Sequence, residues 1–146
     1  MKHIMITLAA LASLTAPTLT YAADSETVQQ AEQAKAFFVN LKDGDTVKNP
    51  VHIVFGISGM EVAPAGMHEP NTGHFHLLID TQLTDEQKQY PIPKDDQHLH
   101  FGKGQTEDTL TLSPGKHALQ LVMGDGDHML HNPPIMSDVI NITVEE

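Results

Sequence analysis

Histidine is the residue type in this chain with the clearest capacity for chemistry, because its imidazoles occur in pairs rather than singly. The sequence contains two His-x-His pairs and a looser third group: His74/His76, His98/His100 and His128/His131. Neutral imidazole nitrogen is a ligand for zinc, copper and nickel. If the fold brings these groups together, they form a transition-metal site.

The other donor atoms narrow the choice of metal. The chain has no cysteine, which excludes thiolate centres, blue-copper electron transfer and cysteine nucleophiles. Met123 and Met129 lie close to histidines in the sequence, and a thioether is a soft ligand that favours monovalent copper. We therefore expect copper as the first choice of ion and zinc as the second, with either methionine as the soft ligand if copper is monovalent.

The residues around the two His-x-His pairs predict strands, in which alternate side chains point to the same face. In the segment 74–80 the apolar residues at odd positions form the core face, so His74 and His76 share the opposite face. By the same alternation, His98 and His100 project together from a later strand. The pairs would meet if the two strands lie side by side.

The turn-forming residues predict an all-β domain. From residue 36 onward, short apolar or alternating runs are separated by Gly, Pro, Asn and Asp. We expect about seven strands, at 36–41, 51–57, 74–80, 97–101, 109–112, 117–123 and 139–144. Seven short strands in roughly 110 residues favour an immunoglobulin-like antiparallel β-sandwich, here without the Cys and Trp typical of antibody domains.

The amino-terminal segment predicts export. Residues 1–22 combine a basic start, an apolar stretch and small residues before Ala23, which is the pattern of a cleaved signal peptide. Residues 23–35 form a polar lead-in to a single domain at 36–146. Because no later segment is a candidate membrane span, we expect a periplasmic or secreted protein with no membrane insertion after cleavage.

The charge balance excludes one class of partner. The chain has 8 Lys+Arg against 19 Asp+Glu, a formal net charge of -11, and none of the basic residues is Arg. An acidic surface without guanidinium groups repels the phosphate backbone. Nucleic-acid binding is therefore excluded, and the expected partners are a metal ion first and another envelope protein second.

Three other interpretations remain open. The histidines could be structural in a non-enzymatic envelope module for interaction or ligand recognition, or they could titrate together as a pH-sensitive surface. A metal-dependent hydrolase would need an open coordination position and a general base, for which Glu69, Glu107 and Asp127 are candidates. The chain lacks a Gly-x-Ser-x-Gly nucleophile motif, and overall we favour binding over turnover.

Longer strings of residues carry a family resemblance: NTGHFHLLID at 71–80, HLHFGKGQTE at 98–107, PGKHALQLVMGD at 114–125, and His128 with HNPP at 131–134. From about Phe37 onward the sequence resembles the bacterial exported family known as domain of unknown function 4399, whose function is unassigned. His98 matches the family pattern less well, and Phe75 stands where the family commonly has a third histidine. The motif positions that match are His74, His76, His100, His117, His128 and His131.

This resemblance implies a shared site. We expect His74, His76 and His100 to be direct nitrogen ligands, with one or more of the other three matched histidines completing the set. The role would be sequestration, delivery or sensing of copper or zinc. A carboxylate could orient an imidazole by accepting its second N–H. The candidates for that position are Asp80, Asp125 and Asp127.

Overall fold

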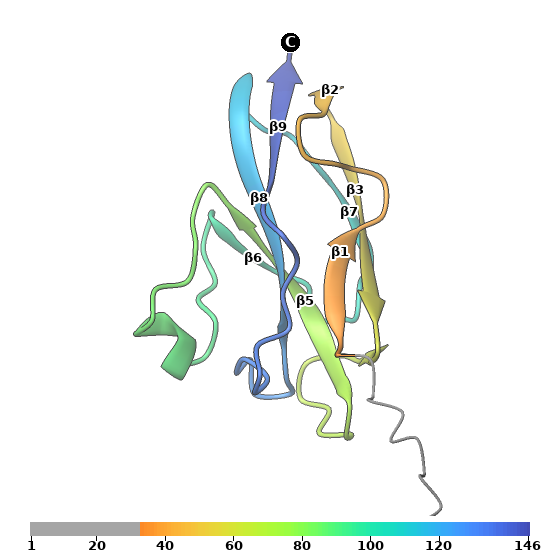
Figure 1. The fold of residues 1–146 in the computed structure, drawn as a ribbon, viewed down its shortest axis with the longest axis vertical. Helices are drawn as coiled ribbons and strands as arrows, with labels where there is room; N and C mark the ends of the chain where they lie inside the picture. Colours follow the sequence, from red (N-terminus) through yellow and green to blue (C-terminus); the bar gives the residue numbers. More distant parts are fainter. Residues whose placement is uncertain (1–32) are drawn as a thin grey trace, which may run out of the picture.

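The computed structural model describes residues 33–146, which fold as an all-β sandwich (Figure 1). The predicted signal peptide and most of the predicted lead-in lie outside the described residues. Within residues 33–146, no helix has the length and hydrophobicity needed to cross a membrane. The elements are β1 (Lys35–Phe38), β2 (Thr46–Lys48), β3 (Val51–Ser58), β4 (Glu61–Val62), β5 (Thr72–Ile79), the short 3-10 helix η1 (Gln87–Gln89), β6 (His98–His100), β7 (Glu107–Leu110), β8 (Gly115–Gly124) and β9 (Ile140–Glu145).

The strands form two sheets, which Figure 1 shows on opposite sides of the molecule. One sheet has the order β1-β3-β7, and the other has the order β2-β9-β8-β5, with β4 and β6 both on the free edge of β5. Every predicted strand overlaps an observed one, so the predicted sandwich is confirmed. The two strands that the sequence did not predict, β2 and β4, pair in parallel with β9 and β5. They have 3 and 2 residues, too few for an alternating pattern.

Apolar side chains fill the space between the two sheets. Phe75 and Leu77 of β5 are fully buried there, as strand alternation predicts. Phe55 of β3 packs against Phe75 with ring centroids 5.2 Å apart, and against Phe101 at 4.7 Å. The buried apolar area stabilises the sandwich and fixes which face of β5 points inward.

The opposite face of β5 is also buried, a feature that strand alternation alone does not reveal. Leu78 and Val122 pack there with Leu83 and Ile92 in a second, smaller apolar cluster. Leu83 and Ile92 belong to the connection between β5 and β6, and the Ile92 N–H donates to the carbonyl of His128 at 2.8 Å. Two long connections, from β5 to β6 and from β8 to β9, therefore cover this face and remove it from water.

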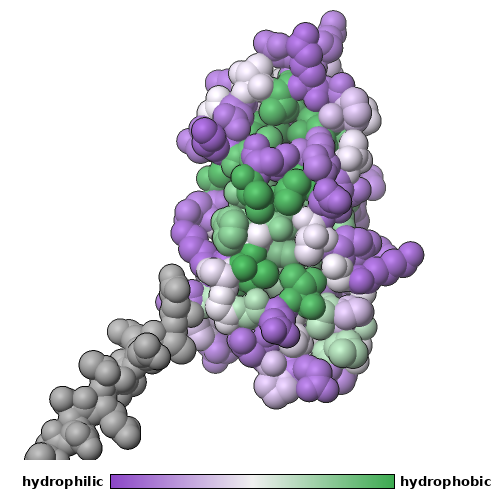
Figure 2. Space-filling view, turned by 90° about the vertical axis from the view of Figure 1, so that its right-hand side faces the viewer, coloured by the Kyte–Doolittle hydropathy of each residue, from purple (hydrophilic) through white to green (hydrophobic). Residues whose placement is uncertain are grey.

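The outer face of the three-stranded sheet differs from this covered face. Figure 2 shows hydrophobic residues gathered along the middle of that side of the molecule, between hydrophilic ones. Phe37 and Val39 are 43% and 58% exposed. The ring of Phe37 occupies the space where a Cβ at Gly56 would lie, so glycine at this position lets the ring rest on β3.

Candidate metal centre

Four histidines from three parts of the chain meet on the covered face of β5. His74 and His76 lie two residues apart on β5, and His100 of β6 is the antiparallel partner of His76. His128 comes from the connection after β8, where its backbone has a positive φ of 67°. The six ring-centroid distances range from 4.8 to 6.1 Å. The fold thus brings together the three main predicted ligands and one of the additional ones, and we call these four residues the histidine cluster.

The Nε2 atoms of the cluster face one another in pairs. The distance between the Nε2 atoms is 3.1 Å for His74 and His76, and it is also 3.1 Å for His100 and His128. One ligand nitrogen from each of His74, His76 and His100 lies within 4.8 Å of the other two. Two nitrogens bound to one tetrahedral ion at about 2.0–2.1 Å are separated by about 3.4 Å. These three histidines could therefore hold a metal ion, and the ring of His128 lies beside them, next to His100.

Two of these imidazoles are completely removed from solvent. His74 and His76 are 0% exposed, and the Nδ1 atom of each has no hydrogen-bond partner among the described residues. Burying an unpartnered polar nitrogen costs free energy, so such groups are uncommon in folded proteins. Coordination of a cation by the Nε2 atoms would leave each Nδ1 as an unpartnered N–H, so its favourable free energy would have to come from the metal–nitrogen bonds themselves.

Burial and mutual repulsion disfavour a proton on three of the four cluster histidines. Burial, followed by the nearby rings of His100 and His128, lowers the pKa of His74 to about 4. Burial, followed by the neighbouring His74, lowers the pKa of His76 to about 3. Burial also lowers the pKa of His100. Near neutral pH His74, His76 and His100 therefore present unprotonated imidazoles, the form that binds a metal ion without first releasing a proton.

A glycine leaves the space that the cluster needs. Gly124 of β8 pairs with His74 of β5. A Cβ added at Gly124 would lie 3.0 Å from Nε2 of His76 and 3.3 Å from Cδ1 of Ile92, so a side chain here would crowd the ring. The role of Gly124 was not predicted, because the strand expected at 117–123 runs one residue further, to a position opposite His74.

His117, a predicted ligand, does not join the cluster. It lies on β8 five residues before Val122, which is the strand partner of His76. Five residues span about 17 Å along a strand, so His117 lies that far from the cluster along β8. Its Nδ1 lies 2.7 Å from Oδ2 of Asp80, and its Nε2 lies 2.8 Å from the carbonyl oxygen of Ser113. Burial opposes a charge on this ring, but the hydrogen bonds to Ser113 and Asp80 outweigh it and raise the pKa of His117. Asp80, predicted to orient a metal ligand, thus orients His117 instead.

Two other predicted residues lie on the core side of the sheet. Met123 is fully buried in the main core as the strand partner of Phe75, so its thioether faces away from the cluster. Gly73 also shares the core face of β5, and a Cβ added there would lie 2.9 Å from Nε2 of His131. The structure therefore does not bring Met123 or His131 to the point where the cluster nitrogens converge.

The remaining predicted residues belong to the loop that carries His128. Oδ1 of Asp125 accepts the backbone N–H groups of Asp127 and Met129, each at 2.9 Å. Asp127 is exposed, and its Oδ2 lies 3.8 Å from Nδ1 of His68. The backbone carbonyl of Met129 accepts a hydrogen bond from the Asp125 N–H at 2.9 Å. These contacts hold the loop together, and none of them involves an imidazole of the cluster.

His98 occupies a different environment from His100, although the two lie on the same strand. It pairs with Leu78 on β5, and its Nδ1 lies 2.8 Å from Oδ1 of Asp95. Its Nε2 is buried and has no hydrogen-bond partner in the described part of the chain. His98 and His100 both line a groove of about 530 Å³, and Asp108 of β7 also lines it. This groove gives solvent a route to His100, at the edge of the cluster.

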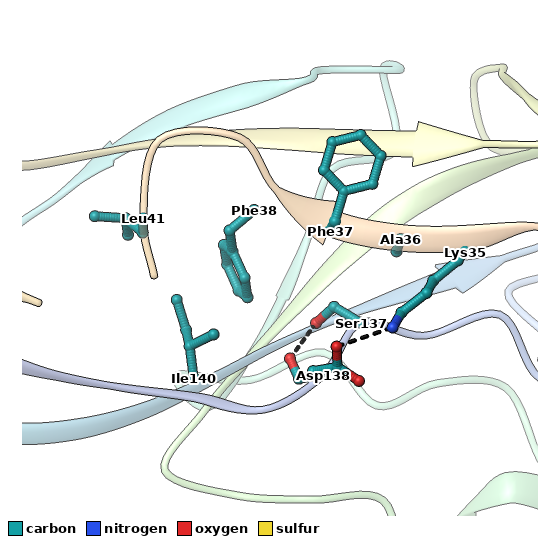
Figure 3. Close-up of a pocket in the computed structure, with 8 residues that line it drawn as sticks. All are labelled: Lys35, Ala36, Phe37, Phe38, Leu41, Ser137, Asp138 and Ile140. Atoms are coloured by element: carbon teal, nitrogen blue, oxygen red, sulfur yellow. Dashed lines mark hydrogen bonds and ion pairs between the residues drawn. The ribbon is translucent and has the colours of Figure 1, made fainter. Parts of the chain in front are cut away.

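A second groove, of about 290 Å³, lies between β1 and the segment that precedes β9 (Figure 3). Phe38 and Ile140 line it, and Lys35 Nζ forms an ion pair with Oδ2 of Asp138 at 2.8 Å. None of its lining residues is a histidine or a methionine. The groove therefore offers no ligand set for a transition metal, and the histidine cluster remains the candidate site.

Comparison with known proteins identifies a family but no function. A family model described as domain of unknown function (DUF4399) matches residues 53–145, a range that contains the whole cluster. No curated protein and no solved structure matches the chain. The family resemblance seen in the sequence is confirmed, and any function has to be argued from the geometry.

Proposed function

The chain belongs to the DUF4399 family, whose name assigns no activity, and on the geometry of the histidine cluster we propose that it is an exported transition-metal-binding protein. The observation that carries this proposal is the pair of 3.1 Å contacts between Nε2 atoms, made by imidazoles from three separate parts of the chain. Buried imidazoles normally pair with carboxylates or carbonyl groups. Here they point at each other, as nitrogen donors around one ion do.

The donor set supports copper first and zinc second. The cluster offers imidazole nitrogen only, and the general order of stability places Cu²⁺ above Zn²⁺ for such ligands. Met123 faces the core, so the structure gives monovalent copper no thioether from that residue. Imidazole nitrogens alone favour divalent copper, and Met129 is the remaining candidate for a thioether ligand to monovalent copper.

The proposed role is sequestration, delivery or sensing in the periplasm or outside the cell. The amino-terminal pattern at 1–22 supports export. With His128 as a fourth ligand beside His74, His76 and His100, the imidazoles would fill a tetrahedral coordination sphere, whereas a catalytic zinc site keeps one position open for water. Binding is thus better supported than hydrolysis, and a bound ion could be passed to another envelope protein through the groove beside His100.

Calorimetric titration of tag-free protein with Cu²⁺ and with Zn²⁺ tests this proposal. Wild-type protein should bind one equivalent, and the double variant His74→Ala/His76→Ala should bind none. The matched control is His52→Ala/His68→Ala, because these histidines are exposed, with side chains 52% and 65% accessible. The control should bind as wild type does.

Two outcomes would contradict the proposal. Wild-type protein that is folded by circular dichroism but binds neither ion would favour a non-enzymatic interaction module with structural histidines. Equal binding by the cluster variant and the control variant would place the metal at surface histidines instead.

A further inference from the structure

The loop that follows β8 is organised around one carboxylate, Asp125. Its Oδ1 accepts the N–H groups of Asp127 and Met129 at 2.9 Å each, and its own backbone carbonyl accepts the His128 N–H at 3.0 Å. The Asp125 N–H in turn donates to the carbonyl of Met129 at 2.9 Å. One residue thus takes part in four hydrogen bonds that close the loop around His128.

These bonds hold His128 in a conformation that it would not adopt by itself. Its φ of 67° lies in the left-handed region, which costs a residue other than glycine about 1 kcal/mol or more. The same conformation places its Nε2 3.1 Å from Nε2 of His100. The loop bonds therefore determine whether the fourth imidazole reaches the cluster.

Asp125 is also close enough to act on the cluster through its charge. It directly follows Gly124, the strand partner of His74. A carboxylate one residue from the strand position opposite His74 favours a cation bound at the cluster.

We infer that Asp125 is a positioning residue of the metal centre, which fixes His128 in place and supplies a negative charge beside the bound cation. This inference rests on the proposed function. Of the three aspartates predicted to orient a metal ligand, only Asp125 is assigned this role, because the other two have different partners. Asp80 bonds to His117 at the far end of β8, and Asp127 is exposed and faces His68.

The isosteric variant Asp125→Asn isolates the charge. Its amide oxygen can accept the same two N–H groups, so the stability of the metal-free protein should stay near that of wild type. The affinity for Zn²⁺, measured by competition with a chelator in tag-free protein, should fall by about tenfold, the lower end of the effect of residues that support ligands. Asp127→Asn removes the same charge from the same loop and should change the affinity less than about twofold.

The variant Asp125→Ala removes the loop bonds as well as the charge. Its affinity should fall further than that of Asp125→Asn, by up to about a hundredfold. The Cu²⁺ complex of Asp125→Ala should show an altered electron paramagnetic resonance spectrum, because one imidazole is lost or displaced. Asp125→Asn should keep the wild-type spectrum.

The possible results separate this inference from the proposed function. If wild-type protein binds no metal, both are overturned. If wild-type protein binds metal and Asp125→Asn binds it equally well, or if Asp127→Asn loses as much affinity, only the charge assigned to Asp125 is overturned. Equal affinities and equal spectra for the Asn and Ala variants would overturn the positioning of His128.

Discussion

Two buried histidine environments lie on the same sheet, about 17 Å apart along β8, and they differ in what surrounds the imidazole nitrogens. Both nitrogens of His117 have oxygen partners, in Asp80 and in the Ser113 carbonyl, and its pKa is raised. His74 and His76 have only other imidazoles at Nε2 and no partner at Nδ1 among the described residues, and their pKa values are lowered. Both kinds of histidine are buried, so burial does not distinguish them. The hydrogen-bond partners of the ring nitrogens distinguish a structural histidine from a candidate ligand.

The largest expected difference between the two environments is the increase in the free energy of unfolding when metal is added. An ion that binds only the folded state at a free concentration of 1,000 Kd stabilises it by about 4 kcal/mol. Wild-type protein and His117→Ala should both gain this amount in urea unfolding with added Zn²⁺. His74→Ala/His76→Ala should gain nothing. A gain that is lost in His117→Ala instead would reverse the assignment of the two environments.

The difference between the environments was only partly predictable from sequence. Alternation along a strand correctly placed His74 and His76 on the face opposite Phe75, because side chains in a strand alternate whatever the rest of the fold does. The same rule groups Met123 with the inward residues of its strand, and the structure finds it there. Its proximity to histidines in the sequence was therefore a weaker guide to its position than its parity.

The contacts that decide function depend on parts of the chain that are distant in sequence. Register between β5 and β6 puts His100, and not His98, opposite His76, and no local pattern fixes that register. Asp80 meets His117 across 37 residues. The sequence of the connections likewise does not reveal that Ile92 helps to bury the cluster, since its cover depends on where the connection packs.

The second effect concerns the metal-free protein. His117→Ala removes the partner of a carboxylate and of a carbonyl group, so the free energy of unfolding should fall by about 2–3 kcal/mol. His76→Leu replaces an imidazole that lacks oxygen partners with an apolar group, and it should change stability by less than about 1 kcal/mol in either direction. Urea denaturation at pH 7.5 in chelator measures both. Equal losses would show that the two environments are equally structural.

The third effect is a pH dependence of opposite sign for the two environments. His74 and His76 have folded pKa values of about 4 and 3 against an ordinary value of 6.5, so their contribution to stability is complete above pH 6.5 and is lost as the pH falls. The loss is about 1.4 kcal/mol per pH unit for each histidine that the fold keeps neutral. His117 has a raised pKa, so its contribution is complete below pH 6.5 and is lost as the pH rises through the folded value.

Variants separate these two limbs of the stability curve. In metal-free protein, His74→Leu/His76→Leu should flatten the acid limb between pH 6.5 and 4.5 and leave the limb above pH 6.5 as in wild type. His117→Ala should do the reverse. If the free energy of unfolding of the leucine variant still falls steeply below pH 6.5, other groups, the carboxylates included, cause the pH dependence.

The smallest expected effect comes from close packing around the histidine cluster. It tests whether metal affinity depends on the space that Gly124 leaves beside His76. In Gly124→Ala the new methyl group would start 3.0 Å from Nε2 of His76, and the ring would have to move by a few tenths of an ångström. Alanine also restricts the unfolded chain, which offsets part of the strain, so the metal-free protein should change by less than about 1 kcal/mol. The Zn²⁺ affinity should nevertheless fall by about fivefold, because ligand geometry tolerates little displacement. Wild-type affinity in Gly124→Ala would mean that the His76 ring can move without loss of binding. The fold would then not hold this ring in a fixed position for coordination.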